Sequence, residues 1–262
     1  MRLLWGLLVL ALLTRGDELV SSQYDPHAAV ANAIKFFDGS REPDALVWLA
    51  WMHRRFGMQE FAGALQRYDE VLSDQPQQAP LRRVLRRVAD RNNPVRAEDW
   101  EAVIHPSDRI TVSALYCDQL GFPASFSEAL RNAFSQGGYY FPHVLLAVFW
   151  IHENGCTLSL PRGFVDDVYR ANAAIIHNDP TRVTDLTLEA AAFLYLAGQG
   201  ALVDDAFLGR VIATQNSDGG WGEAPGLPGH SDWHSSVLGL LFLAHVRSLA
   251  DSADSADASR IR

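Results

Sequence analysis

Basic residues and cysteines are both scarce in this chain. It has 262 residues, with 22 Lys and Arg against 31 Asp and Glu, and a formal net charge of -9. The acidic excess argues against a nucleic-acid partner, because binding a phosphate backbone needs a basic face. Hydrophobic residues make up 48% and charged residues 20%, which is the composition of a globular protein. The sequence therefore predicts a folded protein that does not bind nucleic acid.

The cysteines are only two, Cys117 and Cys156. No zinc-finger spacing can be built from them. In an oxidising compartment they could pair, and closing the long loop between them would contribute a few kcal/mol of stability. Two separate buried thiols are an equal alternative, and the sequence leaves both open.

Long hydrophobic runs are also missing. The apolar run at residues 3–13 follows Arg2 and contains no charge. It is well short of the roughly 20 residues that span a bilayer, but it fits the apolar region of a signal peptide. We predict a signal peptide over residues 1–22 and export to the periplasm or the medium, with no transmembrane helix left after cleavage. An uncleaved membrane tether is the alternative.

Sustained alternation of apolar and polar residues, which a half-buried strand needs, is absent too. Apolar residues come instead in helix-length groups separated by Gly, Pro, Asn and Asp. The pattern predicts an all-α fold, with at most one short helix in the polar stretch 91–107. The helices predicted before residue 140 cover residues 26–37, 43–56, 59–73, 81–90, 110–120 and 125–134.

Strongly apolar segments recur in the second half of the chain, at residues 144–151, 190–197 and 237–246. Each is apolar almost all round, as is typical of a helix buried on most sides. Between them lie more amphipathic segments that match one another. Recurrence at this period predicts helical hairpin repeats, arranged as an α/α toroid or, alternatively, as an open α-solenoid.

These repeats suggest the domain boundaries. A single α-helical repeat domain is predicted over residues 23–247. It divides into a divergent half at 23–106 and a more regular half at 107–247. The low-complexity Asp, Ser and Ala stretch at 248–262 is predicted to be a disordered tail.

The most specific motif is Gln-Asn-Ser-Asp-Gly-Gly-Trp-Gly at residues 215–222. Its glycines permit a tight turn at the end of a helix, and the Gln215 side chain can hydrogen-bond the backbone of that turn or of a neighbouring helix. We predict a structural clasp between adjacent repeats. With Gln215, Gly219 and Trp221 in these positions, the stretch resembles the repeat of the terpenoid cyclase and protein prenyltransferase superfamily, which includes the squalene–hopene cyclases.

The resemblance implies an α/α toroid, in which inner helices surround a central cavity and outer helices pack around them. The known catalytic motifs of the superfamily are missing. No Asp-x-Asp-Asp acid motif occurs, and the nearest pairs, at 166–167 and 204–205, lie in predicted first turns of helices, where carboxylates favour the helix dipole. The cysteine of the prenyltransferase zinc set is not recognisable either, so no zinc ligand is transferred. The resemblance therefore defines no reaction, and whether the chain is an enzyme stays open.

Polar residues stand at the start of each buried segment, and they are the candidates for chemistry. The catalytic candidates are His143, Asp185, Asp232 and His234, with Glu189 completing a polar ring and His230 nearby. His230, Asp232 and His234 could bind a divalent metal or supply an acid and a base if that segment is extended. If Ser231 or Asp232 caps the helix, their side chains are predicted to diverge. Ordinary capping and core packing are the alternatives for every member, and metal binding stays open.

Aromatic residues in the predicted buried helices are the candidates for a ligand pocket. Trp48, Trp51, Trp150 and Tyr195 either line a cavity for an apolar or sugar-like ligand or pack in the core. No nucleotide-binding or nucleophile-elbow motif is present, and no cofactor-binding residue is predicted. The leading hypothesis is an exported α/α-toroid protein with a central pocket for a lipid, isoprenoid or glycan. The alternative is a non-catalytic repeat module that binds an envelope protein.

Overall fold

The computed structural model describes residues 24–74, 79–222 and 230–260, so the predicted signal peptide lies outside the described residues. Within these ranges the secondary structure is helical, and the only bridge between extended residues joins Trp221 and Asp232. The prediction of an all-α fold is confirmed. No helix in the described ranges is long and apolar enough to cross a membrane.

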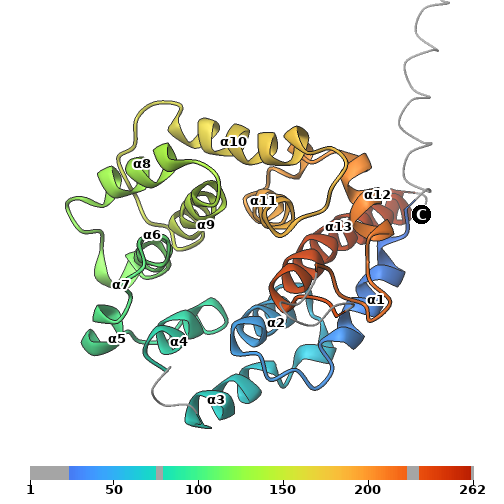
Figure 1. The fold of residues 1–262 in the computed structure, drawn as a ribbon, viewed down its shortest axis with the longest axis horizontal. Helices are drawn as coiled ribbons and strands as arrows, with labels where there is room; N and C mark the ends of the chain where they lie inside the picture. Colours follow the sequence, from blue (N-terminus) through green and yellow to red (C-terminus); the bar gives the residue numbers. More distant parts are fainter. Residues whose placement is uncertain (1–23, 75–78, 223–229, 261–262) are drawn as a thin grey trace, which may run out of the picture.

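One set of helices lies around a common centre in Figure 1, and we call these the inner helices. The three strongly apolar segments of the sequence lie in the last three of them, whose central residues are buried on nearly all sides. The inner helices are α2 (Pro43–Phe56), α4 (Ala79–Leu85), α6 (Pro106–Leu115), α9 (Tyr140–Glu153), α11 (Asp185–Leu196) and α13 (Trp233–Arg260).

The remaining helices pack on the outside of the inner ones (Figure 1). Asp204 caps α12 through a hydrogen bond from the Phe207 amide, and Asp166 and Asp167 lie in the first turn of α10, as their sequence positions predict. The outer helices are α1 (Pro26–Phe36), α3 (Ala64–Asp74), α5 (Ala97–Glu101), α7 (Cys117–Leu120), α8 (Phe126–Gln136), α10 (Phe164–Asn178) and α12 (Asp205–Ala213). Short 3-10 helices are η1 (Gln59–Phe61), η3 (Arg86–Val88) and η4 (Gly200–Leu202).

Consecutive inner helices pack against one another. α6 contacts α9, α9 contacts α11, and α11 contacts α13, which in turn contacts α2 and α1. The side between α4 and α6 is joined by hydrogen bonds, because the Tyr116 hydroxyl donates to the Val84 carbonyl at 2.9 Å and Arg87 donates to the Leu115 carbonyl at 2.8 Å. The helix that ends the described chain thus lies beside the helices that begin it.

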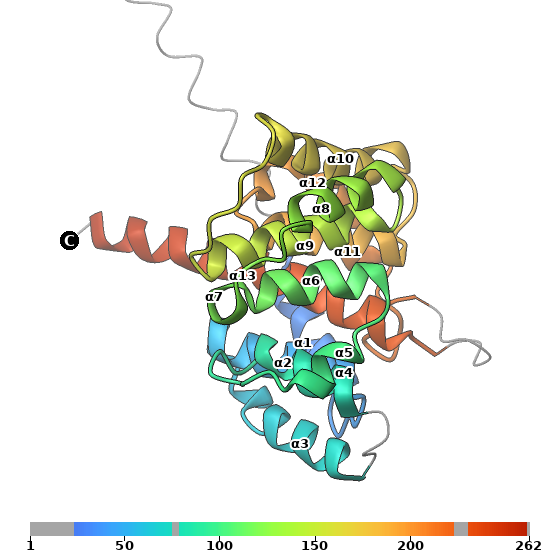
Figure 2. The same ribbon diagram turned by 90° about the vertical axis from the view of Figure 1, so that its left-hand side faces the viewer.

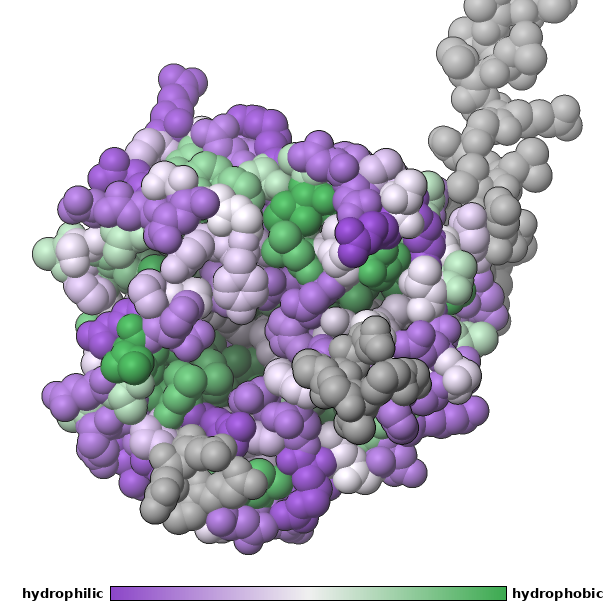
Figure 3. All heavy atoms as spheres, viewed as in Figure 1, coloured by the Kyte–Doolittle hydropathy of each residue, from purple (hydrophilic) through white to green (hydrophobic). Residues whose placement is uncertain are grey.

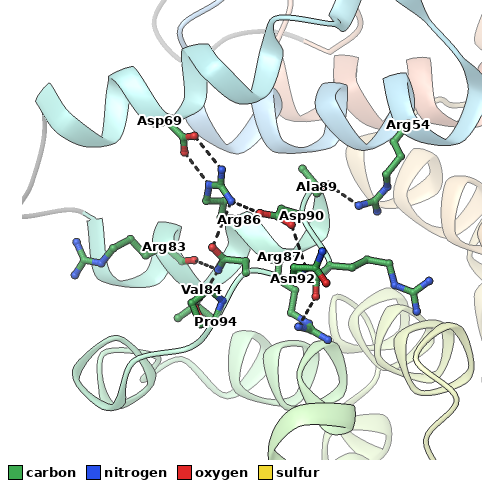
Figure 4. A network of polar contacts seen from close by, with 12 residues as sticks. Arg54, Asp69, Arg83, Val84, Arg86, Arg87, Ala89, Asp90, Asn92 and Pro94 are labelled. Atoms are coloured by element: carbon green, nitrogen blue, oxygen red, sulfur yellow. Dashed lines mark hydrogen bonds and ion pairs between the residues drawn. The ribbon is translucent and has the colours of Figure 1, made fainter.

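Arginines anchor the segment of α4 and η3 to its neighbours (Figure 4). Arg86 donates hydrogen bonds to both carboxylate oxygens of Asp69 in α3 and a further one to Asp90. Arg87 is only 2% exposed and forms an ion pair with Asp118 beyond α6. A buried guanidinium without such a partner would be strongly destabilising. The charges of Arg86 and Arg87 are therefore neutralised by aspartates of this chain, which indicates that the two arginines have a structural role.

A disulfide joins Cys117 of α7 to Cys156, which follows α9. Of the two alternatives that the sequence leaves open, the structure has the paired one. The bond ties the outer segment after α6 to the carboxyl end of the inner helix α9.

The carboxyl-terminal segment differs from its prediction. α13 continues as a helix through Arg260, beyond the start of the predicted disordered tail at Ser248, and Figure 2 shows this end extending away from the other helices. The stretch contains alanines and no Gly or Pro that would end a helix, so it continues the helix already nucleated by the buried part of α13. Low sequence complexity alone did not distinguish a disordered tail from an extension of the helix.

The predicted clasp connects the segment after α12 to α1. The Gln215 side-chain amide donates to the Ala29 carbonyl of α1 at 2.8 Å and to the Gly219 carbonyl at 2.9 Å. Trp221 is 1% exposed, and its indole nitrogen donates to the Val211 carbonyl at 2.7 Å. Gly219 has a φ of 93°, and a Cβ there would lie 2.3 Å from the Asn32 carbonyl oxygen.

Substituting Gly219 with Ala is expected to destabilise the protein by about 3 kcal/mol or more, because it combines backbone strain with a clash against α1. Gly39→Ala is the matched control, since Gly39 also has a positive φ, of 69°, but no atom within 4 Å of the added Cβ. The control should lose only about 1 kcal/mol. Urea unfolding of both variants measures the difference, and equal losses would show that the contact between Gly219 and α1 does not matter.

Removing the disulfide with Cys117→Ala and Cys156→Ala together is expected to lower the free energy of unfolding by about 3 kcal/mol, because the bond closes a loop with a sequence separation of 39. Thermal unfolding should show the same loss when the unaltered protein is reduced. Reductant should leave the double variant unchanged. A reduced protein as stable as the oxidised one would show that the bond does not restrain the unfolded chain.

Candidate functional site

The inner helices enclose a cavity of about 440 Å³. Figure 3 shows a hollow near the centre of one face, with hydrophobic residues inside it and hydrophilic residues around it. Each inner helix contributes residues spaced three or four apart, which is the spacing of one helical face. The lining includes Asp44 and Trp48 of α2, Asp108 of α6, Tyr139, His143, Leu146 and Trp150 at and within α9, Asp185, Glu189 and Phe193 of α11, and His234 of α13.

The polar residues of the cavity stand at the amino-terminal ends of the inner helices. Asp44, Asp108 and Asp185 each lie in the first turn of their helix, and His143 and His234 lie in the first turns of α9 and α13. The amino-terminal end of a helix carries a partial positive charge, so acidic side chains are favoured there. Because these ends meet around the same cavity, one end of it is polar and acidic. We call this end the cavity mouth.

Further along the helices the lining becomes aromatic and aliphatic. The ring of Trp48 stacks with that of Trp150 at 6.3 Å and with that of Phe193 at 6.1 Å between centroids. Of the four aromatic candidates from the sequence, Trp48 and Trp150 line the cavity. Trp51 is 2% exposed and packs against Phe56 in the core. Tyr195 packs against Phe242.

At the mouth, His234 and Asp185 form a hydrogen-bonded pair that joins α13 to α11. The distance from His234 Nδ1 to Asp185 Oδ1 is 2.7 Å, and the Ser235 hydroxyl donates to the same oxygen at 3.0 Å. Burial lowers the pKa of His234, but the hydrogen bond and the charge of Asp185 outweigh it and raise the pKa overall. For Asp185, the hydrogen bond and charge of His234 likewise outweigh burial and lower the pKa.

Asp232 caps α13 by accepting a hydrogen bond from the Ser235 amide at 2.9 Å. The sequence predicts that such a cap turns the candidate side chains apart, and His230 does lie elsewhere, near Asp218. Asp232 and His234 nevertheless converge, with Asp185 as the third member. One ligand atom of each lies within 4.8 Å of those of the other two, so this group of the described chain could hold a metal ion.

His143 and Glu189 form a second pair, between α9 and α11. His143 Nδ1 donates to the Tyr139 carbonyl at 3.1 Å and lies 3.8 Å from Glu189 Oε1. Burial lowers the pKa of His143 to about 4 and raises the pKa of Glu189 to about 8. Near pH 7 both are therefore uncharged, and the pair is not an ion pair. The other carboxyl oxygen of Glu189, Oε2, is buried without a hydrogen-bond partner.

The structure thus brings His143, Asp185, Glu189 and His234 to one cavity, with Asp232 beside them. Asp44, Asp108 and Tyr139 also line it and were not identified from the sequence. The signal for the two aspartates was an acidic residue in the first turn of an inner helix, but α2 and α6 lie outside the recognisable repeat. Chemically, the mouth offers carboxyl and imidazole groups that can exchange protons or bind a cation, above a wall of aromatic rings.

Replacing Glu189 with Gln is expected to stabilise the protein increasingly as the pH rises. The folded pKa of about 8 exceeds the ordinary value of 4.5, so the folded state holds a proton that the unfolded state has lost between these values. Wild-type stability should therefore fall through this window, while a Gln side chain cannot ionise. Thermal unfolding at several pH values measures the gap, which should widen from about pH 5 to about pH 9 and then stay constant. Glu60→Gln, at an exposed site, should follow the wild type. A gap that stays constant would mean that Glu189 has the same pKa in the folded and the unfolded protein.

Comparison with known proteins finds no relative of this chain. No protein-family model matches the chain, and neither a curated protein nor a solved structure does.

Proposed function

We propose that the chain is an exported α/α-toroid protein, similar to terpenoid cyclases and prenyltransferases, whose central cavity binds a small amphiphile of the isoprenoid or lipid class. The observation that carries this proposal is the division of the cavity into a polar mouth and an aromatic and aliphatic interior. A ligand with an apolar body and one polar end matches this division.

The same division argues against a glycan. A sugar chain carries hydroxyl groups along its whole length and needs hydrogen-bonding partners along the whole pocket. Beyond the mouth the lining is mostly aromatic and aliphatic, as at Trp48, Trp150 and Phe193, and it offers few such partners. Transfer of an apolar chain onto such a surface is favoured by roughly 25 cal/mol for each Å² removed from water.

The polar end of the ligand would face the mouth. Glu189 has a buried oxygen without a partner there, and His143 and His234 stand on the two adjacent helices. These groups can donate or accept a hydrogen bond at the ligand's polar end and are placed for proton transfer to it. If the chain is an enzyme, these are the groups that would act on the polar end of the ligand, and Glu189 is the one whose carboxyl oxygen still lacks a partner.

Export is proposed on two grounds. The apolar run at residues 3–13 has the length of a signal-peptide core, and the disulfide between Cys117 and Cys156 forms in oxidising compartments. The periplasm and the extracellular medium both meet this condition.

A non-catalytic module that binds an envelope protein on its outer surface is the competing function. Such a module would show a contiguous exposed apolar patch. The large exposed hydrophobic residues of the described chain are instead spread over different elements: Ile104, Leu120, Tyr139 and Leu249. The cavity is thus the better-supported site.

Filling the cavity is expected to abolish ligand binding. We suggest Leu146→Trp, which adds volume at a residue of α9 that lines the cavity. Leu120→Trp is the matched control, because Leu120 is 52% exposed on α7. Equilibrium dialysis with radiolabelled farnesol, and with N-acetylglucosamine for comparison, measures binding. The proposal predicts farnesol binding by the wild type and the control, and at least a roughly 10-fold loss in the filled variant. Binding of the sugar alone, or farnesol binding that is equal in all three proteins, would contradict it.

A further inference from the structure

The group of Asp185, Asp232 and His234 at the cavity mouth comes from two inner helices. Asp185 begins α11, whereas Asp232 directly precedes α13 and His234 lies in its first turn. One ligand atom of each lies within 4.8 Å of those of the other two. The side chains of His234 and Asp185 are 34% and 44% exposed, so an ion can reach them. One oxygen of Asp232 accepts the capping hydrogen bond from Ser235, which fixes the carboxylate in place.

A second observation points to a missing partner at the same place. Glu189 lies one turn further along α11 than Asp185, on the same face, and lines the same cavity. Its side chain is 4% exposed, and its Oε2 atom is buried with no hydrogen-bond partner. An unsatisfied buried carboxyl oxygen costs free energy unless something else binds it. Of its acidic neighbours at the mouth, Asp44 is already paired with Arg82 at 3.6 Å, whereas Asp108 and Asp185 face the cavity and make this end attractive to a cation.

We propose that the mouth binds one divalent transition-metal ion of the Zn²⁺ type, through His234 Nδ1 and the carboxylates of Asp185 and Asp232. Imidazole nitrogen and carboxylate oxygen are ligands that Zn²⁺ takes at about 2.0–2.2 Å, so its ligands stand about 3.4 Å apart. In the observed group these atoms lie within 4.8 Å of one another, so side-chain rotations must bring them to that spacing. The ion would take the place of the proton that His234 shares with Asp185.

The donor set also indicates which ions are disfavoured. Mg²⁺ and Ca²⁺ prefer sites made of oxygen ligands alone, whereas one imidazole favours Zn²⁺ and its neighbours in the first transition series. Three protein ligands leave a coordination position open toward the cavity, which is the arrangement of catalytic rather than structural zinc sites. Glu189 would then lie beside the open position.

This inference goes beyond the proposed function and does not depend on it, because metal binding requires no amphiphile in the cavity. Isothermal titration of the chelator-treated protein with Zn²⁺ tests it, with Mg²⁺ as the comparison. The expected result is one Zn²⁺ per chain, bound at least about 10-fold more tightly than Mg²⁺. Substitution of Co²⁺ gives a second readout, since ligation by the site should produce visible absorption bands.

Asp232→Asn is the most informative variant. Asparagine caps helices as well as aspartate does, so α13 should remain intact while the ligand loses its charge. Asp204→Asn is the matched control, because Asp204 caps α12 in the same way, with a hydrogen bond from the Phe207 amide. We expect Zn²⁺ affinity to fall at least about 10-fold in Asp232→Asn and to be unchanged in Asp204→Asn, with both circular dichroism spectra equal to the wild type.

His230→Gln distinguishes this site from the alternative metal site of His230, Asp232 and His234, which are close together in the sequence. His230 lies near Asp218 and outside the group of three, so its loss should leave Zn²⁺ binding unchanged. The proposal is overturned if the wild type takes up no Zn²⁺, or if His230→Gln weakens binding as much as Asp232→Asn. Farnesol binding by Leu146→Trp addresses the amphiphile separately, so failure of one proposal does not imply failure of the other.

Discussion

The packing of α13 against α1 and α2 is the contact on which the cavity depends. The residues of α13 from Val237 to Ala244 are almost completely buried, and Gln215 ties the segment before this helix to α1. Without that contact, the inner faces of α2 and α11 would open to water and lose the apolar burial that stabilises them. With it, the inner helices stand around one space (Figure 1), as expected for the proposed toroid. The clasp at Gln215 therefore helps to hold together the helices that surround the cavity.

Placing the amino-terminal ends of several helices at one end of a cavity has an electrostatic consequence. The helix dipoles favour carboxylates in the first turns, yet burial penalises their charge. The outcome for the pKa differs between Asp185 and Glu189. Asp185 keeps a lowered pKa because His234 pairs with it, whereas Glu189 has no such partner and its pKa is raised to about 8. The result is a mouth where charged and neutral acids lie side by side, which suits both proton exchange and cation binding.

Much of this arrangement could be predicted from the sequence, and the limits are physical. The all-α fold and most helices followed from apolar periodicity, and His143, Asp185 and His234 were identified because each precedes a buried segment. Asp44 and Asp108 were missed because α2 and α6 lie outside the recognisable repeat. The place of this part of the chain beside the repeats is set by long-range contacts such as that of Arg87 with Asp118. The same limit applies to the disulfide. The extension of α13 past Ser248 was missed because local composition does not reveal a helix nucleated by buried residues upstream.

The central claim is that the space between the inner helices is a ligand site rather than an incidental gap. The most direct measurement is the mass of the protein, purified from the cells that produce it, under native and under denaturing conditions. The account predicts a native mass that exceeds the polypeptide by a small apolar molecule, lost on denaturation. A native mass equal to that of the bare polypeptide would contradict it.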